Sequence, residues 1–220
     1  METNPVIKVS MADDHVLLRN ALATLIDSFG DCRVIHQSGT GKELTNSITA
    51  GDIPNVVLLD LNMPDMNGFE TAEWMQANYP QVHVLMLTMY DSELSMIRLL
   101  QAGVKGFLKK DIHPSELKFA IHSVIQSGYY YSNHTTGKLV NLFRNSLDGN
   151  INIQNVILSV PELQFLKLAC PDLTYKEIAQ QMKLNPRSVD TLRNQLFTKL
   201  NVKSRVGLAM VAIKQGVVTF

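Results

Sequence analysis

The chain has 220 residues, a hydrophobic share of 45%, and 20 basic against 20 acidic side chains, a composition typical of a globular protein rather than a disordered or fibrous one. No apolar run approaches the ~18 residues of a membrane helix, and the start lacks a secretory signal pattern, so we expect a cytoplasmic protein. Cys32 and Cys170 form neither a metal motif nor a disulfide framework, which fits a reducing compartment.

The balanced charge conceals a difference between the two parts of the chain. Residues 1–150 carry 11 Lys and Arg against 16 Asp and Glu, a net charge of −5. Residues 151–220 carry 9 against 4, a net charge of +5. This asymmetry predicts two domains, and it makes nucleic acid a candidate partner of the second.

The first part of the chain alternates short apolar strands with amphipathic helices. Strands are predicted over 6–10, 32–36, 55–59, 82–87 and 106–109, and helices over 16–29, 42–49, 68–78, 91–102 and 114–127. Five strand–helix units of this length predict an α/β fold. We expect a doubly wound, five-stranded parallel sheet with helices on both faces, the flavodoxin-like arrangement.

The rhythm changes after residue 127. A tyrosine run at 129–131 and a helix over 135–143 precede a stretch rich in Asn, Asp, Ser and Gly at 145–155, which reads as a linker. Capping boxes begin at Ser159 and Thr174, and Asn185 followed by proline marks a third helix start, so a small all-α, four-helix domain is predicted. A tight turn at 183–185 is typical of a helix-turn-helix. The predicted organisation is 1–127, a linker over 128–157, and 158–220.

Polar side chains follow the ends of four predicted strands. Asp13 and Asp14 come after the first strand, Asp60 and Thr88 end two others, and Lys110 follows the last. In an open parallel sheet these ends meet along one edge. Three carboxylates there need a cation, and a hydroxyl beside an ammonium needs an anion. Mg²⁺ and a phosphoryl group carried on an aspartate meet both needs.

Four blocks of sequence carry a family resemblance: DDH at 13–15, DLNMPDMNG at 60–68, LTMYD at 87–91 and GFLKKD at 106–111. They resemble the signature blocks of a receiver domain. Residues 158–218 resemble the DNA-binding domain of the NarL/LuxR class. The whole chain is therefore similar to a two-component response regulator of that class.

The resemblance implies roles for the polar residues at the strand ends. Asp60 is the implied phospho-acceptor, Asp14 a direct Mg²⁺ ligand, Asp13 a ligand directly or through water, and Asn62 a ligand through its backbone carbonyl. Taken singly, these residues also fit ordinary loop and capping roles. With no metal present, three close carboxylates repel, and at least one pKa should rise.

A switch is implied next to this site. Lys110 pairs with the phosphoryl oxygens and Thr88 hydrogen-bonds one of them, after which the ring of Phe107 turns inward. The Gly-aromatic-Leu-x-Lys spacing favours Lys110 over Lys109 for this role. A static core phenylalanine at position 107 is the alternative, since the sequence does not separate the two.

The third helix of the second domain, predicted over 186–200, is the implied recognition helix, and the preceding scaffold helix is predicted over 173–182. Apolar residues at 189, 192, 196 and 200 form its core-facing stripe. We expect the basic side chains to contact phosphates and the Thr and Asn side chains to touch base edges. The candidate DNA contacts are Lys176, Arg187, Thr191, Arg193, Asn194, Lys199 and Arg205.

Two features of this domain leave alternatives open. Asp190 stands where many relatives carry lysine; it either pairs with Arg187 or Arg193 along the helix, which we favour, or accepts a hydrogen bond from cytosine. Val206 and Met210, with residue 213, lie on one face of the last helix. That face is either a dimer interface or the closure of the four-helix core.

The expected function is a phosphorylation-dependent transcription regulator. A sensor histidine kinase would donate the phosphoryl group to Asp60, and phosphorylation would control homodimerisation and binding to double-stranded DNA. The alternative is a protein-binding adaptor with little DNA binding. A Mg²⁺-dependent phosphatase is disfavoured, because its acid/base carboxylate would stand at the position of Asn62. We expect no metabolic enzyme, only slow loss of the chain's own aspartyl phosphate.

Overall fold

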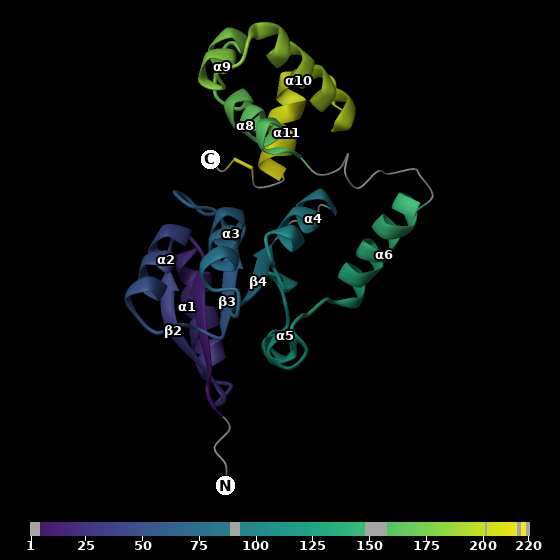
Figure 1. Ribbon diagram of the computed structural model, residues 1–220. Coiled ribbons are helices and arrows are strands. Elements are labelled where there is room, and N and C mark those ends of the chain that lie inside the picture. The colour runs from purple at the N-terminus through teal and green to yellow at the C-terminus, as the bar shows by residue number, and fades with distance from the viewer. Residues whose placement is uncertain (1–4, 89–92, 148–157, 201, 215–216, 219–220) are drawn as a thin grey trace. The chain divides into compact units, whose positions relative to one another are not determined.

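The computed structural model describes residues 5–88, 93–147, 158–200, 202–214 and 217–218. The chain forms two compact units, the first containing a β-sheet and the second a group of helices (Figure 1). None of the helices within the described ranges is long and apolar enough to cross a membrane.

The first unit contains a five-stranded, all-parallel sheet. Its strands are β1 (Ile7–Ala12), β2 (Cys32–Ser38), β3 (Val56–Asp60), β4 (His83–Thr88) and β5 (Gly106–Lys109). They are ordered β2-β1-β3-β4-β5. The chain therefore adds β2 on one side of β1 and then adds β3, β4 and β5 on the other side. This order confirms the predicted doubly wound fold. The bounds of β5 agree with the prediction, and the ends of the other strands differ by one or two residues, for example where pairing continues to Ala12 and Thr88.

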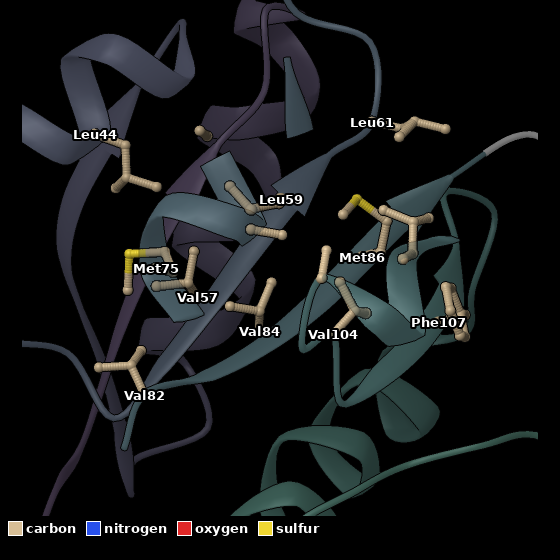
Figure 2. Close-up of a cluster of buried hydrophobic side chains, with 14 of the residues drawn as sticks. Leu44, Val57, Leu59, Leu61, Met75, Val82, Val84, Met86, Val104 and Phe107 are labelled. Atoms are coloured by element: carbon tan, nitrogen blue, oxygen red, sulfur yellow. The ribbon is translucent and has the colours of Figure 1, made fainter. Parts of the chain in front are cut away.

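Helices cover both faces of the sheet. They are α1 (Val16–Asp27), α2 (Gly41–Ala50), α3 (Gly68–Asn78), α4 (Glu93–Gln101) and α5 (Pro114–Ser127). Alternate strand residues face opposite layers. Val57 and Leu59 pack with α2, α3 and α4 in the cluster that Figure 2 shows. Val56 and Leu58 pack with α1 and α5 on the other face.

Two details of the predicted helix faces are wrong. Apolar residues at 18, 21, 22 and 25 predict one buried face of α1, yet Ala21 is exposed, while Ala23 and Ile26 are buried. Apolar residues at 117, 121, 124 and 125 predict the buried face of α5, yet Ile125 is 38% exposed, and Ala120 is buried instead. The cause in both helices is the rotation of the helix against the sheet, which determines which edge of a broad apolar stripe is covered.

The segment after α5 contains a bridge to the sheet and a helix. Tyr130 forms a parallel bridge with Gly106 at the edge of the sheet. The helix α6 (Asn133–Leu147) is longer than the predicted 135–143, so its last turn includes residues that were predicted as loop. The rest of the predicted loop, from 148 onward, lies outside the described residues.

The second unit is helical, as predicted. Its helices are α8 (Val160–Ala169), α9 (Tyr175–Gln181), α10 (Pro186–Lys199) and α11 (Arg205–Lys214). Both predicted capping boxes form, at Ser159 and Thr174, and the Asn185 side chain accepts from the backbone N–H of Ser188. The box at Thr174 starts α9 two residues later than expected. In the turn before α10, Lys183 has φ 55°, the left-handed conformation that a tight turn requires.

Candidate functional sites

Three carboxylates meet at the carboxyl edge of the sheet. Asp13 follows β1 and Asp60 ends β3, and these strands pair side by side through Ala12 and Leu59. Asp13 is fully buried and Asp60 is 4% exposed. Oxygens of both residues, together with one of Asp14, lie within 4.8 Å of one another. The strand order therefore brings together side chains that are separated by almost fifty positions in sequence.

Lys110 is the cation of this cluster. Its Nζ lies 2.9 Å from Asp13 Oδ2 and 2.9 Å from Asp60 Oδ2, and its side chain is 9% exposed. Lys109, the last residue of β5, is exposed instead. The geometry thus resolves the ambiguity of the lysine pair, because Lys110 alone of the two reaches the carboxylates.

The electrostatic balance of the cluster is negative. Burial raises the pKa of the Asp60 carboxyl above its ordinary value; the Lys110 ammonium opposes this effect, and Asp13 and Asp14 raise the pKa further. Burial lowers the pKa of Lys110, but its contacts with Asp13 and Asp60 outweigh that effect, so the pKa is raised. One ammonium among three carboxylates leaves room for a further cation. Hard carboxylate oxygens fit Mg²⁺.

Thr88 and Phe107 lie on neighbouring strands beside the cluster. Thr88 ends β4, one residue beyond the Leu87 that pairs with Asp60, and it is 6% exposed. Phe107 lies on β5 in the apolar cluster of Figure 2 and is 7% exposed. Asn62 lies two residues past Asp60 and is half-buried. Thr88 thus ends the strand next to the one that carries Asp60, and Phe107 lies one strand further along the sheet.

Gly68 lets α3 begin directly against the end of β3. Its N–H donates to the Leu61 carbonyl at 2.9 Å. A Cβ on Gly68 would lie 2.2 Å from the Asp60 carbonyl oxygen, a distance that no side chain tolerates. Glycine at this position therefore keeps the Asp60 loop close to the helix start.

The His15 side chain lies against the acidic cluster. Its Nδ1 lies 2.7 Å from Asp14 Oδ1 and 3.1 Å from Asp13 Oδ1. Its backbone N–H donates to Asp13 Oδ1 at 2.8 Å. An aspartate that accepts from the N–H two residues later is an Asx turn, and this local signal was available in the sequence.

In the second unit, Asp190 pairs with Arg193. The distance from Asp190 Oδ1 to Arg193 Nη1 is 2.9 Å, so the favoured intrahelical pair forms with Arg193 rather than Arg187. The Arg193 guanidinium also lies over the Tyr175 ring, 4.9 Å from its centroid. Arg187 and Thr191 are exposed on α10. The helix therefore presents both a restrained and an exposed arginine.

Two predicted DNA contacts have partners inside the unit. Lys199 Nζ lies 2.9 Å from Glu162 Oε1 and 2.8 Å from Oε2. Arg205 donates to the backbone carbonyls of Ala169, Pro171 and Leu173, which follow or end α8. These contacts tie α10 and α11 to α8 and restrict both basic groups.

The helix α11 closes the helical core, but not with the face that carries Val206 and Met210. Leu208 and Ala212 are fully buried in the helical core, whereas Val206 is 72% exposed and Met210 is 51% exposed. The core-closure alternative for the face of Val206 is therefore wrong, and this apolar face lies open within the described part of the unit.

A receiver-type sheet with an acidic pocket, followed by a helix-turn-helix unit, defines the class of two-component response regulators. The model of the response regulator receiver domain matches residues 9–122, and that of bacterial regulatory proteins of the luxR family matches residues 156–212. The chain belongs to the response regulator receiver family and, with its second match, is a response regulator of the NarL/LuxR type. It is a phosphorylation-dependent transcription regulator rather than a metabolic enzyme.

Full-length relatives share this organisation. The oxygen regulatory protein NreC of Staphylococcus carnosus is 29% identical over 218 residues, covering 97% of this chain and 100% of NreC. The response regulator ChrA of a heme-sensing two component system is 25% identical, with a TM-score of 0.52, over 98% of this chain and 100% of ChrA. RcsB from Salmonella enterica serovar Typhimurium shares the fold at 19% identity and a TM-score of 0.65, over 93% of this chain and 97% of RcsB.

Proposed function

We propose that Asp60 accepts a phosphoryl group from a sensor histidine kinase, and that this modification controls homodimerisation and DNA binding by the helix-turn-helix. In this proposal residues 1–127 form the receiver domain, 128–157 the linker and 158–220 the DNA-binding domain. The observation that carries the proposal is the contact of one buried ammonium, Lys110, with both Asp13 and Asp60 at 2.9 Å.

The proposed transfer uses the buried carboxylate as nucleophile. An oxygen of Asp60 attacks the phosphorus of a phosphohistidine as the P–N bond breaks, and the electron pair of that bond stays on the imidazole nitrogen. Lys110 then moves from a carboxylate oxygen to a phosphoryl oxygen, and the Thr88 hydroxyl donates to another. Both groups stabilise charge that is greatest in the transition state.

A Mg²⁺ ion fits the same cluster. Asp13, Asp14 and Asp60 would hold it with the backbone carbonyl of Asn62, and the converging carboxylate oxygens support this assignment. When bound, the ion neutralises charge that gathers on the transferred group. Burial raises the pKa of Asp60 and the charges of Asp13 and Asp14 raise it further, so a bound cation would favour the ionised carboxylate. Slow loss of the phosphate by hydrolysis returns the chain to its resting state.

The proposed DNA surface is the exposed side of α9 and α10. Lys176 and Arg187 are exposed and would contact phosphates, and Thr191 and Asn194 are exposed and would reach base edges. Arg187 and Thr191 line a shallow hollow at the start of α10. Contacts with DNA from three further basic residues would require each side chain to leave or share its partner within the protein; these residues are Arg193, Lys199 and Arg205.

A relative supports the DNA part of the proposal by analogy. RcsB, which shares the fold, is described bound to the promoter rprA in the presence of the phosphomimetic BeF3-. In this chain the exposed Val206 and Met210 on α11 are the surface that we assign to pairing of two DNA-binding domains.

The test is phosphorylation of the full chain by a small phosphodonor with Mg²⁺, followed by selection of bound DNA from a random pool. Wild type should gain the mass of one phosphoryl group, and Asp60→Asn should gain none. The matched control is Asp65→Asn, an exposed carboxylate in the following loop, which should be labelled like wild type. Equal labelling of Asp60→Asn would exclude the acceptor assignment. If Asp60 is phosphorylated but no DNA is recovered, DNA binding is excluded and the protein-binding adaptor becomes the supported function.

A further inference from the structure

The segment after α5 pairs with the edge of the sheet through one isolated parallel bridge at Tyr130. Gly128, at φ 84°, ends α5 and reverses the chain. The Tyr130 N–H then donates to the Lys105 carbonyl at 2.8 Å, beside the parallel bridge to Gly106. A Cβ on Gly106 would lie 2.4 Å from the Tyr130 carbonyl oxygen, so the close approach depends on this glycine. The pairing holds this segment against β5, the strand that carries Phe107.

Successive residues of this extended segment pack into opposite layers of the sheet. Tyr130 is buried on the α1 and α5 side, and its hydroxyl donates to Glu116 Oε1 at 2.7 Å. Tyr131 packs on the other side, where its ring centroid lies 6.2 Å from that of Phe107 at an interplanar angle of 30°. Tyr129 stacks on Tyr131 at 5.8 Å and 19°. Phe107, Tyr131 and Tyr129 therefore form a continuous row of rings.

The row leads directly into the helix that continues toward the second unit in sequence. Ser132 follows Tyr131 and accepts from the Thr135 N–H at 3.2 Å, which fixes the first turn of α6. Leu139 of α6 packs against the same apolar cluster as Tyr131 and Phe107. A small cavity lined by Thr88, Phe107, Ser132 and Thr135, among others, separates the strand ends from this turn. Space is thus present where the two switch residues face the start of α6.

We propose that Tyr131 is a positioning residue that couples the state of Phe107 to the start of α6, so that phosphorylation acts on the linker through this ring contact. The inference rests on the proposed function and on the switch of Thr88 and Phe107 that the family resemblance implies. A ring packed against Phe107 cannot keep its contact when Phe107 changes rotamer, since packed side chains occupy discrete arrangements. Tyr131 is one residue from the α6 cap, so its displacement changes the orientation or the stability of the first turn.

The test observes the ring itself in the full chain. Fluorotyrosine is incorporated biosynthetically, the tyrosine resonances are assigned with Tyr→Phe variants, and fluorine spectra are recorded before and after addition of Mg²⁺ and beryllofluoride. The fluorine signal of the bound beryllofluoride reports adduct formation independently. Tyr79, which packs beside Trp74 after the end of α3, is the internal reference. We expect the Tyr131 resonance to shift, the Tyr79 resonance to stay, and the Tyr131 shift to be lost in Phe107→Leu.

The outcomes separate this inference from the proposed function. If the adduct forms and the Tyr131 resonance stays in place, the coupling role of Tyr131 is overturned and the phosphorylation site stands. If no adduct forms in wild type, the proposed function fails, and the inference fails with it. A Tyr131 shift of equal size in Phe107→Leu would show that the signal reaches the linker by another route.

A second measurement tests the consequence for DNA. The ratio of DNA affinities with and without beryllofluoride is compared between wild type, Tyr131→Leu and the control Tyr79→Leu, a tyrosine that packs beside Trp74 outside the row of rings. We expect the ratio to fall by about fivefold or more in Tyr131→Leu, the lower end of common allosteric couplings, and to stay unchanged in Tyr79→Leu. An unchanged ratio in Tyr131→Leu overturns the inference even if Phe107→Leu fails to fold.

Discussion

The Lys199 ammonium lies 2.8 Å from Glu162 Oε2 and joins the last turn of α10 to the first turn of α8. Glu162 also accepts from the Ser159 N–H at 2.6 Å, so its carboxylate serves both as a cap and as an ion-pair partner. Side-chain exposures of 17% for Lys199 and 11% for Glu162 put the pair at the margin of the core. Lys199 is therefore as much a part of the fold as of the basic surface.

Lys199→Met should destabilise the second unit. The substitution keeps the aliphatic stem and leaves the Glu162 carboxylate half-satisfied, which costs about 1–3 kcal/mol for a largely buried charged group. Urea unfolding of the full chain, followed by circular dichroism, measures the loss. The control Lys176→Met removes an exposed lysine and should change stability by less than about 0.5 kcal/mol. Equal effects of the two substitutions would contradict a structural role for Lys199.

The same pair predicts acid sensitivity of the second unit. Burial raises the pKa of Glu162, but the hydrogen bonds from Lys199 and Ser159 outweigh it, so the pKa is lowered from its ordinary 4.5. A depressed carboxyl pKa contributes stability that is fully present above the unfolded value and is lost as pH falls through the folded value. Free energies of unfolding of the second unit should therefore decline below pH 4.5 in wild type. Glu162→Gln should show a shallower decline; an identical curve would remove this explanation.

Asp190→Asn should strengthen DNA binding if α10 is the recognition helix. The substitution removes a negative charge from the proposed DNA surface and releases the Arg193 guanidinium from its 2.9 Å ion pair. One added phosphate contact steepens the dependence of log affinity on log salt by about one unit. Affinity measured across a salt series gives both values. Asp172→Asn, an exposed acid before α9, is the matched control; a similar gain there would indicate a general charge effect.

Lys110→Met should abolish most phosphotransfer while Lys109→Met should not. Removal of one positioned charge that stabilises the transition state typically lowers the rate by about 10²-fold or more. Lys110 contacts both buried carboxylates, whereas Lys109 is exposed. Labelling rates with a small phosphodonor at saturating Mg²⁺ compare the two variants. A strong loss in Lys109→Met alone would reverse the assignment.

Mg²⁺ should stabilise wild type more than Asp13→Asn. The ion binds only the folded carboxylate cluster, so its addition raises the melting temperature by mass action. Asp13→Asn replaces one fully buried carboxylate of that cluster, and the stabilisation should shrink or vanish. Thermal unfolding with and without the ion measures the difference. Equal stabilisation of both proteins would place the ion elsewhere.

Local signals predicted most of the secondary structure. The predicted bounds of α3 and β5 agree with the structure, because a capping box at Asn67 begins α3 and glycine and lysine delimit β5. The stripe on α10 is also confirmed, with Val189 and Leu196 fully buried. The predictions fail where the outcome depends on the rotation of a helix against the sheet or on a contact between distant residues. Neither the exposure of Ala21 nor the partner of Lys199, 37 residues away, has a local signal.

Sequence by itself determined the class of fold and the chemistry available at one edge of the sheet. Strand periodicity and apolar runs specify a parallel sheet, and the carboxyl ends of its strands must share an edge. The roles of Asp60, Asp13 and Thr88 remain predictions that the geometry supports. Only the folded structure shows which arginine pairs with Asp190 and that Tyr131 contacts Phe107. Those outcomes depend on strand order, helix rotation and side-chain rotamers, which are set by packing between segments far apart in the chain.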